Sequence, residues 1–105
     1  MRLPNPYLDD AAQIGCIACL LDGNEGTPAE LHHPRAKAGM GERGDDEEII
    51  PLCPSHHRTG QGGVIAVHRN TEAFRAKYGE DWLLSSITRN LVMRLRRNTI
   101  GRARA

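Results

Sequence analysis

The residues best suited to chemistry are cysteines and histidines, gathered in three short stretches of a 105-residue chain. Four of the five histidines lie in two of these stretches, Leu31-His32-His33-Pro34 and Pro51-Leu52-Cys53-Pro54-Ser55-His56-His57. The second stretch also contains Cys53, and the other two cysteines form Cys16-x-x-Cys19 near the N-terminus. Thiolates and imidazoles are the ligands that zinc prefers in proteins. The concentration of these residues predicts metal binding, at one site or at two.

The three cysteines and one of the histidines have the spacing of a closed zinc site. Cys16-x-x-Cys19 is followed downstream by Cys53-x-x-His56, and two such pairs separated by a loop match a tetrahedral Cys₃His site. The turn signal Asp22-Gly23-Asn24 after the first pair is typical of a zinc knuckle. Such a site stabilises the fold without doing chemistry, because its coordination shell is full. The alternatives are small buried apolar side chains and a thioredoxin-like redox pair, although no βαβ pattern surrounds these cysteines.

The remaining histidines point to a second, open site. Adjacent residues on a strand face opposite sides, so His32 and His33 are expected to play different parts. His57 follows directly on His56, which places the second site beside the zinc site. His68 is either a third metal ligand or phosphate contact, or a surface histidine at the end of a strand.

The composition favours one small domain that needs a metal site or a cross-link for stability. Hydrophobic residues make up 39% of the chain and aromatic residues 4%, so large buried rings can contribute little stability. A small domain with so few large apolar side chains usually depends on disulfides or a metal. An odd cysteine count argues against a secreted disulfide framework. The sequence shows no signal peptide and no run of roughly 20 apolar residues, so we expect a cytoplasmic protein without a membrane partner. From Arg89 onward the chain carries arginines and no acidic residue, which indicates an interaction tail or a solvated helix face.

The pattern of apolar and turn residues predicts an α+β fold in a single domain over residues 1–105. After an irregular lead-in, a short helix is expected from Asp9 or Asp10 to Ile14. The other expected elements are strands at 29–33 and 49–52, a glycine-rich loop at 35–44, a short helix at 53–58, an apolar run at 64–68, and helices at 72–78 and 81–97. The ββα core then spans about 29–60, the C-terminal helices about 71–97, and a basic tail 98–105.

The order of these motifs resembles that of the HNH endonucleases, also called ββα-metal or His-Me finger nucleases. The matching motifs are Cys16-x2-Cys19, Leu31-His32-His33-Pro34 and Ile49-Ile50-Pro51-Leu52-Cys53-x2-His56-His57. The resemblance implies that His32 and His57 hold a catalytic divalent metal (Mg²⁺, Mn²⁺ or Zn²⁺) and that His33 is the general base. Such a set suits phosphodiester hydrolysis, since a metal neutralises charge at phosphorus and a histidine near neutrality takes a proton from water.

A closer resemblance, over roughly residues 14–90, is to the Ref-like branch of these nucleases. The matching residues are Gly39-Met40-Gly41, Ile50-Pro51-Leu52-Cys53, His56-His57-Arg58-Thr59-Gly60, His68, Phe74 and Tyr78-Gly79. Members of this branch cut DNA where RecA has paired a single strand into a duplex. The resemblance implies a RecA-linked DNA endonuclease of phage or prophage origin, with DNA and the RecA filament as partners and His68 as a third ligand of the catalytic metal. The candidate DNA contacts are Arg35, Arg58, Arg94 and Arg97.

One residue departs from the HNH pattern. Glu48 stands where that pattern has its central Asn, and an ionised carboxylate accepts hydrogen bonds but cannot donate them. This departure supports an alternative function, a catalytically impaired, zinc-stabilised module that binds nucleic acid. A purely structural zinc protein is a third hypothesis, which leaves the surplus of histidines without a role.

Overall fold

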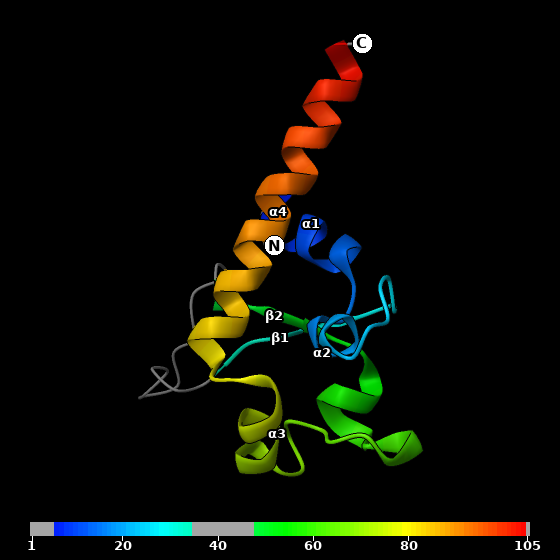
Figure 1. Ribbon diagram of the computed structural model, residues 1–105, viewed down its shortest axis with the longest axis vertical. Helices are drawn as coiled ribbons and strands as arrows, with labels where there is room; N and C mark the ends of the chain where they lie inside the picture. The colour runs from blue at the N-terminus through cyan, green and yellow to red at the C-terminus, as the bar shows by residue number, and fades with distance from the viewer. Residues whose placement is uncertain (1–5, 35–47, 105) are drawn as a thin grey trace, which may run out of the picture.

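The computed structural model of the chain describes residues 6–34 and 48–104, with side chains as far as residue 98. The fold is α+β, as predicted, and consists of a two-stranded sheet surrounded by helices (Figure 1). Its elements are α1 (Pro6–Ile14), α2 (Ile17–Leu21), β1 (Glu30–His32), β2 (Ile50–Leu52), the π-helical turn η3 (Ser55–Thr59), the 3₁₀ turn η4 (Gln61–Gly63), α3 (Thr71–Tyr78) and α4 (Asp81–Arg104).

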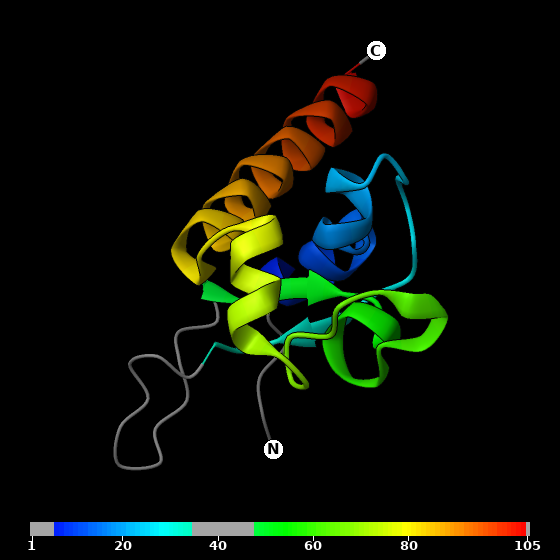
Figure 2. The same ribbon diagram turned by 60° about the horizontal axis from the view of Figure 1, so that its bottom comes forward.

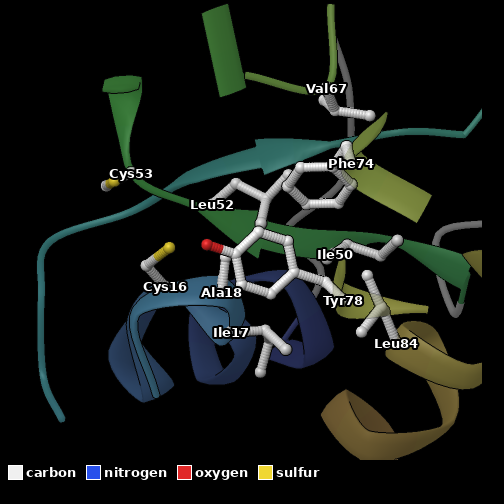
Figure 3. Packing of buried hydrophobic residues seen from close by; sticks show 10 residues of the cluster. All are labelled: Cys16, Ile17, Ala18, Ile50, Leu52, Cys53, Val67, Phe74, Tyr78 and Leu84. Atoms are coloured by element: carbon white, nitrogen blue, oxygen red, sulfur yellow. The ribbon is translucent and has the colours of Figure 1, made fainter. Parts of the chain in front are cut away.

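The sheet is antiparallel and separates two apolar clusters. Residue 30 pairs with 52, 31 with 51 and 32 with 50, and side chains alternate between the two faces along each strand. One cluster contains Ile50 and Leu52 with the buried rings of Phe74 and Tyr78 from α3 (Figure 3). The other joins Ile49 and Leu31 to α1 and α4 through the buried residues Ala11 and Val92. The strands therefore lie between these two clusters, and α4 contributes to both, through Leu84 and Val92.

Helix α4 shows the predicted amphipathic pattern. Leu84 is buried, and Ile87 and Leu91 pack against the first cluster. The helix begins at Asp81, as predicted, and its last turns extend beyond α1 (Figure 1). In the view of Figure 2, α3 lies across the start of α4 and close to the strands.

Two predicted helix boundaries were wrong by several residues. α1 begins at Pro6 and not at Asp9 or Asp10, because proline fits the first turn of a helix, where its missing N–H needs no partner. α4 ends at Arg104 and not near Arg97, so residues 98–104 continue the helix; arginine is a good helix former and suits a helix C-terminus. The apolar run at 64–68 forms no strand and leads into a turn.

Helix α3 is capped at both ends. The Asn70 side chain accepts a hydrogen bond of 3.1 Å from the backbone N–H of Ala73, and Gly79 ends the helix. The predicted loop at 35–44, with Arg35 and its glycines, lies outside the described residues. Among residues 6–34 and 48–104, no helix has both the length and the apolar character needed to cross a membrane.

Gly15 is required where α1 turns into the first cysteine pair. Its φ is +87°, and an added Cβ would lie 2.9 Å from the carbonyl oxygen of Thr27. That same oxygen accepts a 2.9 Å hydrogen bond from the N–H of Cys16, so any shift there also moves a zinc-ligand candidate.

We expect Gly15→Ala to lower the free energy of unfolding by roughly 2–4 kcal/mol, from a left-handed backbone cost added to overpacking. Urea denaturation of the metal-loaded protein measures the loss. Gly23→Ala is the matched control, because φ is +98° but nothing lies within 4 Å of the added Cβ. It should cost only about 1–2 kcal/mol, and equal losses in the two variants would contradict the steric role of Gly15.

Candidate metal centres

The first candidate centre brings together the four residues of the predicted zinc site. Cys16, Cys19, Cys53 and His56 place one ligand atom each within 4.8 Å of one another. The Sγ atoms of Cys19 and Cys53 are 3.8 Å apart, and His56 Nδ1 lies 3.6, 3.5 and 3.2 Å from the sulfurs of Cys16, Cys19 and Cys53. The group can hold a metal such as zinc.

These separations fit a tetrahedral zinc ion. Bonds of roughly 2.3 Å to sulfur and 2.0–2.1 Å to nitrogen, at tetrahedral angles, put sulfur atoms roughly 3.8 Å apart and sulfur and nitrogen roughly 3.5 Å apart. The three cysteines are free of disulfides. The donor set and its spacing therefore fit a structural zinc ion, and all four positions of the shell are filled by protein atoms.

Local backbone structure aims the sulfurs at one point. Cys16 caps α2, and its sulfur accepts a 3.3 Å hydrogen bond from the N–H of Cys19. The second pair repeats this arrangement, with a 3.5 Å hydrogen bond from the N–H of His56 to the sulfur of Cys53. Cys16 with Cys19, and Cys53 with His56, thus each lie on a tight helical turn that brings the two ligand atoms to the same side.

A hydrogen-bonded chain outside the cluster orients His56. With Nδ1 turned towards the sulfurs, its Nε2–H donates to the Tyr78 hydroxyl at 3.0 Å, and Tyr78 donates to Asp22 Oδ2 at 2.8 Å. Figure 3 shows the Tyr78 hydroxyl directed towards the side on which Cys16 and Cys53 lie. Burial, and then the Asp22 carboxylate, raise the pKa of the tyrosine, so it stays protonated and keeps this donor. Such partners of a ligand histidine fix its tautomer and raise its affinity for metal.

Burial raises the pKa of the Cys16 thiol to about 12. Without a metal this thiol is therefore neutral at pH 7, and the same burial lowers the pKa of His56. A metal must displace the thiol proton when it binds, which couples metal loading, proton release and folding.

The second candidate centre consists of His32, His57 and His68, whose ligand atoms also lie within 4.8 Å of one another. The Nε2 atoms of His57 and His68 are 3.0 Å apart, and the ring of His32 lies 5.1 Å and 5.0 Å from those of His57 and His68. Two nitrogens bound to one ion at roughly 2.0–2.1 Å lie about 2.9–3.4 Å apart, depending on the bond angle. The trio thus fits one metal ion and leaves other coordination positions to solvent or substrate.

The π-helical turn η3 explains how neighbouring histidines serve two different centres. Its i→i+5 hydrogen bond from Gly60 N–H to the Ser55 carbonyl is 2.8 Å, and Gly60 closes the turn with φ +68°. Buried His56 then faces the cysteines while half-buried His57 faces the other histidines. Two backbone hydrogen bonds join the following turn to η3. The N–H of Val67 donates to the carbonyl of His56 at 2.8 Å, and the N–H of His68 donates to that of His57 at 3.1 Å. These bonds place His68 beside His57.

Glu30 supports this centre and was missed in the sequence. Its Oε1 accepts a 2.8 Å hydrogen bond from His57 Nδ1, which leaves Nε2 of that ring available to a metal. Arg58 holds the carboxylate with a two-pronged contact, at 2.8 Å through Nε and 2.6 Å through Nη2. The Arg58 and His57 hydrogen bonds lower the pKa of Glu30 to about 2. The available signal was its position two residues before His32, since residues i and i+2 of a strand share a face.

His32 is buried at the end of β1 and is neutral at physiological pH. Burial, followed by the neighbouring rings of His57 and His68, lowers its pKa to about 4. Protons therefore compete with a metal for this ring only in acid. His32 and His57 lie in the trio, whereas His33, half-buried with an enclosed Nε2, lies outside it.

The predicted DNA contacts are scattered. Arg58 is exposed but holds Glu30, and Arg94 and Arg97 are exposed on α4. Arg35 lies outside the described residues.

Comparison with known families supplies the identification. Residues 6–92 match the model of a family described as recombination enhancement, RecA-dependent nuclease. The chain belongs to this family. Neither the curated proteins nor the solved structures give a match.

The Cys₃His group of this nuclease family member is expected to hold one zinc ion on which the fold depends. Cys16→Ser should remove that ion and lower the free energy of unfolding by roughly 5 kcal/mol or more, because structural zinc contributes folding energy directly. Metal analysis by mass spectrometry and thermal melting measure both effects. His57→Ala is the control, since it should keep the zinc and most of the stability. An unchanged melting curve in Cys16→Ser would contradict the structural role.

Glu30→Ala should weaken divalent metal binding at the histidine trio by about 10–100-fold, the usual cost of removing the partner of a ligand histidine. Titration calorimetry with Mn²⁺ on zinc-loaded protein measures this affinity. Glu25→Ala, at an exposed residue, is the matched control and should bind Mn²⁺ normally. If both variants bind Mn²⁺ like the wild type, Glu30 does not orient the ligand His57.

Proposed function

We propose that the protein is a divalent-metal-dependent DNA endonuclease of the HNH type, which acts with RecA in recombination. The observation that carries the proposal is the histidine trio beside the Cys₃His group, with three imidazole nitrogens converging on one point at the end of β1. Membership of the RecA-dependent nuclease family supports the reaction class and the partner.

In the proposed reaction, the histidines and Glu30 have separate roles. His32, His57 and His68 hold the cation, and Glu30 keeps His57 in the tautomer that presents Nε2. A divalent cation at this place supplies positive charge to a phosphate oxygen and to the departing 3′ oxygen. His33, next along the chain from His32, accepts the proton of the attacking water at a ring nitrogen.

The Cys₃His group would position this machinery without taking part in the reaction. It ties α2 to the turn after β2, and η3 carries His56 of one centre and His57 of the other. A small error in the placement of His57 would misalign the trio, and misplacement by about 1 Å can cost 10²-fold in rate. Zinc binding would therefore support catalysis by fixing the position of His57.

A module that binds nucleic acid without cutting it is the second candidate. It is favoured by Glu48, a half-buried carboxylate where the HNH pattern has an Asn. Under this hypothesis the trio still binds metal, but DNA is retained intact.

A cleavage assay separates the two. Supercoiled plasmid, with Mg²⁺ or Mn²⁺ and with or without a RecA filament on a complementary single strand, should be cut by the wild type and more efficiently with RecA. His33→Ala should lower the rate by about 10²–10⁴-fold, the usual contribution of a general base, while zinc content and melting stay unchanged. Gln13→Ala, at an exposed position on α1, is the control. Equal rates for wild type and His33→Ala would overturn the assignment of the base, and no cutting by either would favour the binding module.

A further inference from the structure

A pocket of about 280 Å³ opens at the start of α4, outside both metal-ligand groups. Its lining includes Pro34 and Glu48, Arg75 of α3, and Asp81, Trp82 and Arg89 of α4. A volume at the lower end of ligand pockets suits a single small group and excludes a large ligand.

The pocket adjoins the histidine trio. Pro34 follows the His32-His33 pair directly. Pro34 itself lines the pocket, so the chain runs directly from the histidine pair into the pocket wall.

Trp82 is the most exposed of the large apolar side chains among the described residues, with 70% of it exposed. Burying an aromatic ring is strongly favourable, so an exposed indole at a pocket rim indicates an external partner. Bases of single-stranded nucleic acid stack on such rings.

The charges around the pocket favour a base inside it and phosphates outside it. The lining carries three carboxylates, Glu48, Glu80 and Asp81, against two arginines, Arg75 and Arg89, and carboxylates repel a phosphate. They accept hydrogen bonds from the exocyclic amino group of a base such as cytosine. Arg75 already holds the Asp81 carboxylate at 2.8 Å, and half-buried Glu48 also lines the pocket.

Further along α4, the exposed face turns basic. Trp82, Arg89, Met93 and Arg97 follow one another at intervals of seven, four and four residues, which puts them on one side of a helix. Met93 and Arg97 are exposed. A strand whose base enters at Trp82 would have arginines beside its backbone.

We propose that this pocket binds one unpaired base of the DNA strand, stacked on Trp82, with its amino group donating to Glu48. The inference deepens the proposed function, on which it rests, by placing a base-recognition site next to the cleavage centre. Cytosine is preferred over thymine, because thymine presents carbonyl oxygens where cytosine presents an amino group.

Trp82 is the chain's single tryptophan, so its fluorescence reports on the pocket directly. Zinc-loaded protein without Mg²⁺ or Mn²⁺ is titrated with oligo(dC), oligo(dT) and an abasic backbone of equal length. Oligo(dC) should quench the emission, at several-fold lower concentration than oligo(dT), and the abasic strand should leave it unchanged. Quenching by the abasic strand equal to that by oligo(dC) would overturn the proposal.

Variants test the same contacts by fluorescence anisotropy of labelled oligo(dC). Trp82→Ala should weaken binding about tenfold, in line with the loss of one stacked base, and Trp82→Phe should recover most of it. Glu48→Gln should narrow the difference between oligo(dC) and oligo(dT). Leu21→Ala, which removes another exposed apolar side chain (48% exposed) away from the pocket, is the matched control.

Other outcomes separate this proposal from the nuclease function. If Trp82→Ala binds oligo(dC) like the wild type but loses stimulation by RecA, the surface is a protein contact and the base pocket is refuted. If base-dependent quenching occurs while no metal supports plasmid cutting, the pocket stands and the nuclease proposal fails.

Discussion

The meeting of Cys16 and Cys19 with Cys53 and His56 is the interaction on which the rest of the structure depends. The sheet has three residues in each strand, too few to be stable without support. Joining the α2 turn to the turn after β2 closes a long loop of the chain and places both around one cluster, on which the apolar core of Figure 3 borders. Aromatic residues make up only 4% of the chain, so the apolar core is small. A metal at this point would add stability that such a core does not supply.

The turn η3 also assigns two adjacent histidines to different ligand groups. A regular α-helix would rotate His57 by about 100° from His56, and η3 adds the wider π-helical geometry closed by Gly60. The two imidazoles then belong to different groups, one enclosed by sulfur and one open. π-Helical turns are uncommon and often occur at functional sites, and the convergence of three histidines here agrees with that tendency.

Polar partners outside each group complete the arrangement. Tyr78 and Asp22 orient His56, while Glu30 and Arg58 orient His57. Each set of contacts joins residues that are distant in sequence. The two centres therefore share the turn η3, but different side chains orient their histidines. The start of α4 adds a pocket that Glu48 helps to line.

The sequence by itself determined the Cys₃His set, because cysteine and histidine spacing is local and a tetrahedral metal accepts few combinations. It also determined the strands near 30 and 50 and the start of α4, where the pattern of apolar and turn residues is clear. Only the tertiary structure decided that His68 joins His32 and His57, because this depends on backbone hydrogen bonds between a turn and η3. Glu30, Tyr78, Asp22 and the pocket at Trp82 likewise emerged only in three dimensions, since a polar side chain acquires its role from the distant groups that folding brings beside it.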